Sequence, residues 1–557
     1  MAERAGGKSL TYVPTISTML ILIQFDGDVD YRSPVELVVT GQIPAYAAGI
    51  LYRTGPGGCQ VVTEKGTTFT ASHWFDGFAQ VHRFQIIAPS KPSAQTKVFY
   101  NSRKTVDKLI ENIRKSGSFK GFTFGQKHDP CESYFKKFTS MFTPREADAN
   151  VNVTFSIDLP GLPSAKSSKK EGGGHASGIQ TLWVKTDATV LKRLDPETLE
   201  PIGMAQQTNL HPDLKGAMSA AHAKSDPVTG DVYNFNLDVG RKPTYRVFHV
   251  SASTGETEIL ATITNAKSAY IHSLFLTENH VVLCVWGSYY AYGGAKLLWE
   301  QNILDALNPL DESIPSTWFV VDRKYGTGVV ATYESTPFFC FHTINAWEEP
   351  STTDSSKTDI VADLVAYDNC DILKKLYYNN VKATSTGSRD FVGKKGDSAR
   401  PAIKRWRLPN IEAKLDSGMG KAILEWAAPK SSSVELPTMN FRNITRPYRY
   451  IYGVSDTGAS TFFDQITKYD THTHKNITWQ YHGQTPGEPI FVPDPKGNEE
   501  DEGVLLSVVL DGTKGKSYLL VLDARNLQEV GRASMESVVA FGFHGNHIKS
   551  GDGRLDY

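Results

Sequence analysis

Four histidines lie in apolar stretches where a polar ring needs a partner. In residues 334–350, ESTPFFCFHTINAWEEP, His342 follows an aromatic run that is typical of a strand buried on both faces. A buried imidazole needs partners for both ring nitrogens, so it is either hydrogen-bonded in a core or bound to a metal. Three more histidines have comparable surroundings: His222 in SAAHAKSD, His272 in SAYIHSLF and His544 in VVAFGFHGNH.

The spacing of these histidines excludes a site built from one local segment. Consecutive members are 50, 70 and 202 residues apart. A metal site made from them would need each ring to come from a different part of a closed structure, such as the inner strands of a β-propeller. Neutral imidazoles suit iron, copper, zinc or nickel, so the residue type does not name the metal. Four separate core histidines are the alternative interpretation.

Strand signals dominate the chain, and one hairpin pattern recurs. It begins at residues 191, 248, 319, 466 and 519, for example LKRLDPETLEPIG and LLVLDARNLQEVG. In each case a strand ends at Asp or Ser, whose side chain can bond the amides of the turn. Repeated hairpins of one kind predict radially arranged antiparallel sheets, hence an all-β propeller. A stack of separate sandwiches is the rival prediction.

Helical signals are sparse. KTVDKLIENIRKSG at 104–117 has one apolar stripe and a Ser-Gly stop, and GKAILEWAA at 420 is a second, short candidate. Two polar stretches, a Ser/Lys/Gly-rich insertion at 163–178 and a loop at 382–399, interrupt the strand pattern without changing it. We therefore expect a single propeller domain over residues 1–557 with inserted loops.

Composition excludes several classes of protein. The 557 residues are 40% hydrophobic and 21% charged with a formal net charge of −1, which gives no electrostatic reason to expect nucleic acid. Five scattered cysteines without a CxxC pair predict neither a zinc knuckle nor a disulfide framework. No apolar segment of signal-peptide length is evident near the start, and the run Met19–Ile23 is too short to span a bilayer. We expect a cytoplasmic protein whose membrane contact is at most peripheral.

Ordered motifs along nearly the whole chain carry a family resemblance. They include LYRTGPGG at 51, HWFDGFAQVHRF at 73, RLDPETLEPIG at 193, FHTINAWEE at 341 and GEPIFVPDP at 487. This order resembles the carotenoid cleavage dioxygenase (carotenoid oxygenase) family. The resemblance implies a seven-bladed β-propeller with a small helical and loop cap, at about 99–146, over an iron-bearing face. It also implies one non-haem Fe(II) per chain, with four ligands: His222, His272, His342 and His544.

The resemblance further implies carboxylates that accept the far N–H of the ligand imidazoles, which fixes the tautomer. Glu435 and Glu488 match two such positions by their flanking ELPTMN and GEPIFV. Asp187 stands where the third carboxylate is commonly Glu, and it is one methylene shorter, so direct contact with an imidazole stays open. Ordinary loop carboxylates are the alternative. His73 in HWFDG is expected to be structural, and no residue is expected to act as acid, base or nucleophile.

Two further residues resemble those that hold the phenol in stilbene-cleaving members of the family. They are Tyr134, in DPCESYF, and Lys185, in TLWVKTD. On this basis the protein is most similar to fungal resveratrol-cleaving oxygenases. The implied reaction is cleavage of the interphenyl C=C bond of a 4-hydroxystilbene such as resveratrol with O2, giving two hydroxybenzaldehydes. The alternatives are a carotenoid or apocarotenoid cleavage oxygenase acting on a polyene, and a metal-free propeller that only binds partners.

Overall fold

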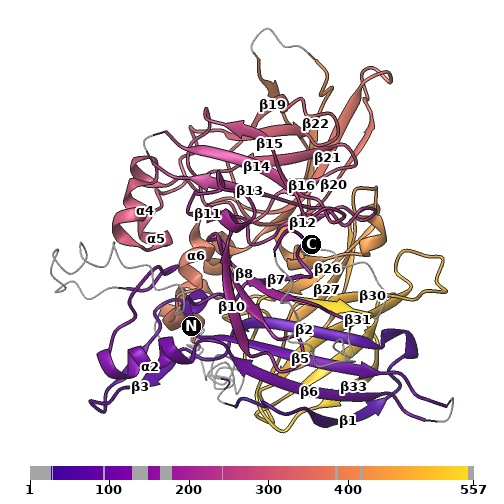
Figure 1. Cartoon of the computed structure of the whole chain (residues 1–557). Coiled ribbons are helices and arrows are strands. Elements are labelled where there is room, and N and C mark those ends of the chain that lie inside the picture. The colour runs from indigo at the N-terminus through magenta and orange to yellow at the C-terminus, as the bar shows by residue number, and fades with distance from the viewer. Residues whose placement is uncertain are drawn as a thin grey trace, which may run out of the picture.

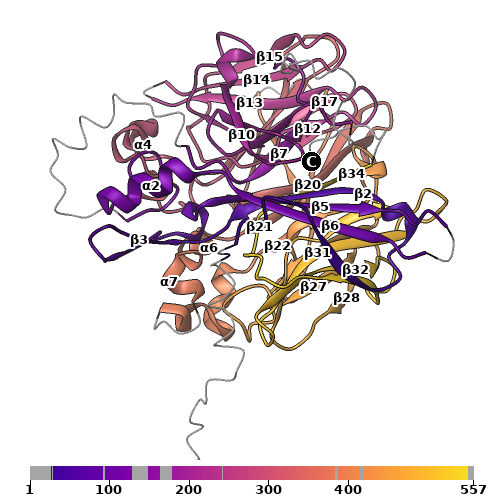
Figure 2. The same ribbon diagram turned by 60° about the horizontal axis from the view of Figure 1, so that its bottom comes forward.

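The computed structural model of the chain describes residues 27, 29–91, 94–127, 149–162, 178–240, 242–382, 387–413 and 418–549. Antiparallel sheets make up most of this part of the protein, and short helices gather on one side of them in both views (Figures 1 and 2). The all-β, propeller-like architecture predicted from the hairpins is therefore confirmed.

Five sheets of four or five strands follow one another along the chain. Each is built mainly from consecutive strands, as expected of propeller blades. The first two sheets contain β7 (Thr154–Ile157), β8 (Leu182–Lys185), β9 (Val190–Leu194) and β10 (Pro201–Gln206), then β11 (Met218–Ser219), β12 (Lys224–Ser225), β13 (Val232–Asp238), β14 (Thr244–Val250) and β15 (Thr257–Ile263). The third contains β16 (Phe275–Leu276), β17 (His280–Val285), β18 (Ser316–Asp322), β19 (Val329–Ser335) and β23 (Gly420–Lys421). The last two contain β20 (Phe339–Pro350), β21 (Thr358–Tyr367), β22 (Ala402–Leu408) and β24 (Ile423–Ala427), then β25 (Glu435–Thr438), β26 (Tyr450–Ser455), β27 (Gln465–Asp470) and β28 (Lys475–Trp479).

The two ends of the described chain meet in one ten-stranded sheet. Its N-terminal strands are β1 (Val35–Gly41), β2 (Gly49–Pro56), β5 (Ala79–Ile87) and β6 (Lys97–Lys104), and a separate ribbon pairs β3 (Gln60–Val62) with β4 (Thr68–Thr70). Its C-terminal strands are β29 (Gln484–Pro486), β30 (Ile490–Pro493), β31 (Gly503–Asp511), β32 (Lys516–Asp523), β33 (Glu529–Ser534) and β34 (Gly545–Ile548). Pairing of β2 with β34 and of β1 with β33 closes the structure on itself.

The number of blades differs from the expectation. Seven separate blades were expected, but among the described residues five sheets stand alone as blades. The physical reason lies in β1, whose residues 35–37 pair with β6 while residues 38–41 pair with β33. Because β1 pairs with both neighbours, the strands on its two sides form one continuous ten-stranded sheet with no free edge between them, and they do not form separate blades.

All five recurrent hairpins are present. They join β9 to β10, β14 to β15, β18 to β19, β27 to β28 and β32 to β33. The expected turn chemistry is clearest at Asp322, whose carboxylate accepts the backbone amides of Lys324 at 2.8 Å and Thr327 at 3.1 Å. Local sequence was sufficient here because the Asp side chain and its amide partners are only a few residues apart.

The helices are α2 (Asp107–Ser116), α4 (Ala295–Glu300), α5 (Ile303–Ala306), α6 (Asp371–Lys375) and α7 (Tyr378–Val381). The helix predicted at 104–117 is confirmed as α2, which ends at Gly117 with a φ of 75°. The helix predicted at 420 is wrong, because this segment forms β23 and β24, and β24 pairs with the edge of β22. None of the helices in the described part of the chain has the length and apolar character needed to span a bilayer.

The inserted segments are described only in part. Within about 99–146 the structure shows the end of β6, then α2 and residues 117–127, whereas residues 128–148 lie outside the described residues. Of the insertion at 163–178 only Gly178 is described. Part of the loop at 382–399 forms two short 3-10 helices, Gly387–Phe391 and Gly393–Ala399.

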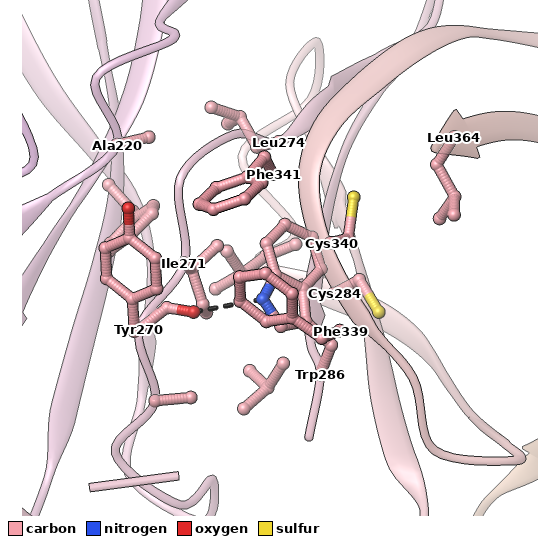
Figure 3. Packing of buried hydrophobic residues seen from close by; sticks show 14 of the residues in the cluster. Ala220, Tyr270, Ile271, Leu274, Cys284, Trp286, Phe339, Cys340, Phe341 and Leu364 are labelled. Atoms are coloured by element: carbon pink, nitrogen blue, oxygen red, sulfur yellow. Dashed lines mark hydrogen bonds between the residues drawn. The ribbon is translucent and has the colours of Figure 1, made fainter. Parts of the chain in front are cut away.

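The largest hydrophobic cluster packs around β20, the strand that carries His342 (Figure 3). Phe339 and Phe341 alternate with Cys340 along this strand, and all three are buried. On the neighbouring segment Trp286 donates its indole N–H to the carbonyl oxygen of Tyr270 at 3.0 Å. The apolar run that precedes His342 thus begins a true core strand, which fixes the histidine near the start of β20.

Candidate metal centre

Four different sheets each bring one histidine to a common point. His222 lies between β11 and β12, His272 precedes β16, His342 lies in β20 and His544 precedes β34. One ligand nitrogen from each ring can be chosen so that all four atoms lie within 4.8 Å of one another, and all four side chains are buried. The two rings nearest in sequence are also tied by their backbones, because the amide of His222 donates to the carbonyl of His272 at 3.2 Å.

Three of the rings are held from behind by carboxylates. His272 Nδ1 lies 2.7 Å from Asp187 Oδ1, and His342 Nδ1 lies 2.5 Å from Glu435 Oε2. His544 Nδ1 lies 2.8 Å from Glu488 Oε1. The structure therefore brings all three carboxylates suggested by the resemblance into contact with histidines of the group, including the shorter Asp187.

These contacts determine which ring nitrogen faces the centre. A carboxylate accepts hydrogen bonds, so Nδ1 of each of these three rings carries the proton and Nε2 is left with a lone pair. His342 Nε2 and His544 Nε2 face each other at 3.3 Å, and His222 Nε2 lies 3.1 Å from His544 Nε2. Burial also lowers the pKa of His222 and His544 well below the usual histidine value, which favours neutral rings.

The donor set fits a divalent transition metal. Two lone pairs that face each other repel, and a cation placed between them removes the repulsion. The spacings of 3.1 and 3.3 Å are those expected of adjacent ligands on an ion with bonds of about 2.0–2.1 Å. Four neutral imidazoles with carboxylates behind them can therefore hold a metal such as Fe(II).

Sequence reasoning missed a further layer of contacts behind the carboxylates. The hydroxyl of Tyr270 donates to Asp187 Oδ2 at 2.9 Å, and that of Tyr367 donates to Glu435 Oε1 at 2.6 Å. Arg53 Nη1 donates to Glu488 Oε2 at 2.9 Å. Tyr270 stands two residues before His272 and could have been suspected from strand alternation. The other two are remote in sequence and left no local signal.

A cavity of about 940 Å³ opens onto this group. His272, His342 and His544 line it together with aromatic side chains: Trp74, Phe75, Phe341, Tyr367, Phe463 and Phe543. The helical side contributes α2, α4, α5 and α6 to the lining through residues such as Ile113, Trp299, Ile303 and Ile372. Its size and the aromatic side chains beside the histidines are those of a site for a sizeable apolar molecule.

The HWFDG segment forms one wall of the cavity. His73 Nε2 lies 2.9 Å from the carbonyl oxygen of Leu373, and its Nδ1 accepts the amide of Phe75 at 3.2 Å. Burial lowers the pKa of His73 to about 3, so the ring is neutral. Asp76 accepts the amides of Phe124 and Gly125 at 2.7 and 2.8 Å. The structural role expected of His73 agrees with these contacts, which hold Phe75 against the cavity.

Of the two residues expected to hold a phenol, the structure describes only Lys185. Tyr134 lies outside the described residues. Lys185 is the last residue of β8 and is only 6% exposed. The described lining of the cavity includes Thr186 and Asp187 but not Lys185.

The propeller-like fold and the site together define a protein with a buried four-histidine metal centre beside a large cavity. Comparison with known proteins then gives the family. The family profile described as "Retinal pigment epithelial membrane protein" matches residues 25–549. This chain belongs to that family, the carotenoid cleavage dioxygenases, and is an iron-dependent, alkene-cleaving dioxygenase.

Individual relatives refine the comparison. The chain is 42% identical to the carotenoid dioxygenase of Neurospora crassa over 558 residues, which covers 95% of this chain and 90% of the relative. It is 42% identical to the torulene dioxygenase of Gibberella fujikuroi, with 94% and 92% covered. The solved structure of a variant of Synechocystis apocarotenoid oxygenase matches with a TM-score of 0.72 at 20% identity, covering 96% of this chain and 99% of that one.

These relatives correct the prediction of substrate. The similarity to resveratrol-cleaving enzymes was expected to be greatest, but these relatives at 42% identity are named carotenoid and torulene dioxygenases. The findings therefore favour the alternative of a carotenoid or apocarotenoid substrate over a stilbene. Membership of an iron-dependent enzyme family also argues against a metal-free propeller that only binds partners.

Proposed function

We propose that this protein cleaves a C=C bond of a carotenoid or apocarotenoid with O2, giving two carbonyl products. The observation that carries this proposal is the meeting of four buried histidines beneath an aromatic cavity of about 940 Å³. Relatives at 42% identity with carotenoid and torulene in their names supply the substrate class. In the net reaction the alkene bond and the O–O bond break, and each alkene carbon receives one oxygen atom.

In this proposal His222, His272, His342 and His544 hold one Fe(II) through their Nε2 atoms. When bound, the iron would supply the O2-activating chemistry that cleavage of a C=C bond by O2 requires. Asp187, Glu435 and Glu488 keep three rings in the Nδ1-protonated form and in fixed orientation, so that their lone pairs point at the metal. No side chain of the site has to transfer a proton or attack the substrate.

The aromatic wall positions the polyene. Phe341 and Phe543 each immediately precede a histidine of the group, and Phe75 contacts both, with ring centroids 5.8 and 5.1 Å away. A planar chain of conjugated double bonds packs well against such rings. These side chains would hold the target bond beside the histidines and keep water away from it.

The mouth of the cavity suits entry of an apolar molecule. Phe122 and Trp299 line the cavity and are 44% and 40% exposed. Leu298, beside Trp299, is also exposed. Because carotenoids reside in lipid, we propose that this rim touches a membrane surface peripherally while substrate enters.

An aerobic assay tests the proposal. Purified protein loaded with Fe(II) is incubated in parallel with β-carotene, an apocarotenal and resveratrol, and products are separated by chromatography. Aldehydes with a polyene chain are expected from one or both carotenoid substrates and none from resveratrol. Benzaldehydes from resveratrol alone would overturn the proposed substrate class and restore the stilbene hypothesis.

A further inference from the structure

A buried arginine from the N-terminal part of the chain contacts the shell behind the histidines. Arg53 lies in β2, within the LYRTGPGG motif, and is 3% exposed. Its Nη1 lies 2.9 Å from Glu488 Oε2 and 3.2 Å from the Glu488 carbonyl oxygen. The other carboxylate oxygen of Glu488 binds His544 Nδ1 at 2.8 Å. Arg53 therefore reaches the histidine group through a single intervening carboxylate.

Two glycines leave the space that the Arg53 side chain occupies. A Cβ atom on Gly487 would lie 3.2 Å from Arg53 Nη2, and a Cβ atom on Gly545 would lie 2.5 Å from Arg53 Cδ. The second distance is shorter than real Cβ contacts. Gly487 precedes Glu488 and Gly545 follows His544, so the segments that carry both functional groups close around the same guanidinium.

The charge of Arg53 distinguishes it from the corresponding partners of the other two carboxylates. Asp187 and Glu435 accept hydrogen bonds from the neutral hydroxyls of Tyr270 and Tyr367. Glu488 receives a cation. The guanidinium forms a buried ion pair with Glu488, and a buried carboxylate without such a partner is strongly disfavoured.

Arg53 also lies at the junction where the two ends of the chain meet. It is paired with Gly545 in the antiparallel ladder of β2 and β34. Next to this pair, the amide of Thr54 donates to the carbonyl of His544 at 2.9 Å, and the amide of Phe543 donates to the carbonyl of Thr54 at 2.8 Å. The backbone of His544 is therefore held by the same strand that supplies the arginine.

From these contacts we infer that Arg53 is a positioning residue that couples the metal centre to closure of the sheet. It orients Glu488 and, through it, His544, so that metal binding and the pairing of β2 with β34 stabilise each other. This inference rests on the proposed metal centre and adds to it a link between cofactor loading and the joining of the chain ends.

Two variants and a matched control test the inference. Arg53→Met removes the charge and the hydrogen bonds, while Arg53→Lys retains the charge with a different donor geometry. Arg405→Met is the control, because Arg405 makes a comparable pair with buried Asp363, at 2.8 Å for both contacts, in another sheet. Co(II) is titrated by calorimetry into chelator-treated full-length protein. Hydrogen exchange of residues 545–548 is followed with and without the ion.

In wild-type protein Co(II) is expected to slow amide exchange in β34. Arg53→Met is expected to bind Co(II) about 10–100-fold more weakly, the range seen when groups behind metal ligands are removed. It should also lose the metal-dependent protection of β34. Arg53→Lys should have a Co(II) affinity and a metal-dependent protection of β34 between those of Arg53→Met and wild type. Arg405→Met should lower thermal stability yet keep wild-type affinity and protection.

The outcomes separate this inference from the proposed function. If wild-type protein fails to bind Co(II), the metal centre itself is refuted. If wild type binds, and a folded Arg53→Met or Arg53→Lys variant matches it in both affinity and β34 protection, the role of Arg53 is overturned. If Arg405→Met weakens binding equally, the effect reflects general destabilisation and the inference is again overturned.

Discussion

Asp187 Oδ1 lies 2.7 Å from His272 Nδ1. An aspartate therefore contacts the imidazole directly at a position where the family commonly has the longer glutamate. Contacts with neighbouring segments hold both the backbone and the side chain of Asp187. The carbonyl of Asp187 accepts the amide of Ser219 at 2.8 Å, which holds this segment against β11. The Tyr270 hydroxyl binds the second carboxylate oxygen at 2.9 Å and fixes its rotation. The reach of a side chain therefore depends on where tertiary contacts place its backbone.

Replacing Asp187 by Asn should weaken metal binding. The amide keeps the shape of the side chain but removes the charge that holds the Nδ1 proton of His272, so we expect a loss of about 10–100-fold in Co(II) affinity. Calorimetric titration measures it. The matched control is Asp311→Asn, in an exposed loop, which should bind as wild type does. Equal affinities for Asp187→Asn and wild type would contradict this role.

Replacing His342 by Ala should reduce turnover of the polyene to the background level and lower the iron content, because one of the four neutral nitrogen donors is lost. Iron content by metal analysis and product by chromatography are measured on the same preparations. His280→Ala is the control, since His280 also pairs with a carboxylate, Glu348, at 2.9 Å but lies outside the histidine group. A His342→Ala protein with full iron content and activity would rule out the proposed ligand role.

Replacing Phe75 by Leu should change how the substrate is positioned more than how well the protein folds. The ring contacts Phe341 and Phe543 beside two histidines of the group. We expect a fall of roughly tenfold in kcat/KM, about 1.4 kcal/mol of lost transition-state stabilisation, and a wider range of cleavage products. Phe84→Leu, in a different hydrophobic cluster, should cost stability without altering product distribution. Unchanged kinetics and products in Phe75→Leu would show that the ring does not position substrate.

The contribution of Glu348 to stability should depend on pH. Burial raises the pKa of this carboxyl, but hydrogen bonds from His280, Thr277 and Asn279 outweigh burial and lower the pKa from 4.5 to about 2. A depressed carboxyl pKa favours the folded state above the unfolded value, and this advantage is lost as pH falls from 4.5 through about 2. Wild type should therefore exceed Glu348→Gln in stability at pH 7, and the difference should shrink by pH 3.

Urea unfolding at the two pH values measures this difference. The comparison of variant with wild type removes the contribution of other carboxylates, which titrate in both proteins. A stability difference that stays constant or grows between pH 7 and pH 3 would contradict the assignment. The exposed pair of Lys516 with Glu536 offers a control, because Glu536→Gln should change stability little at either pH.

Several features could be predicted from the sequence because their causes are local. A carboxylate at the end of a strand binds amides a few residues away, so hairpins such as the one at Asp322 are visible in a short window. The helix of residues 107–116 follows from one apolar stripe and a terminal glycine. The helix predicted at 420 is wrong because the conformation of this segment depends on its pairing with β22 and not on its own periodicity.

The sequence by itself determined which histidines stand in apolar strands, and family motifs indicated that they act together. Only the tertiary structure decided that the four histidine nitrogens lie close together and which carboxylate contacts which ring. It also decided that Arg53 contacts Glu488, which is 435 positions away in the sequence. It also decided the continuous ten-stranded sheet and the shape of the cavity. The physical reason is that these properties depend on contacts between segments brought together by chain closure, for which no local pattern exists.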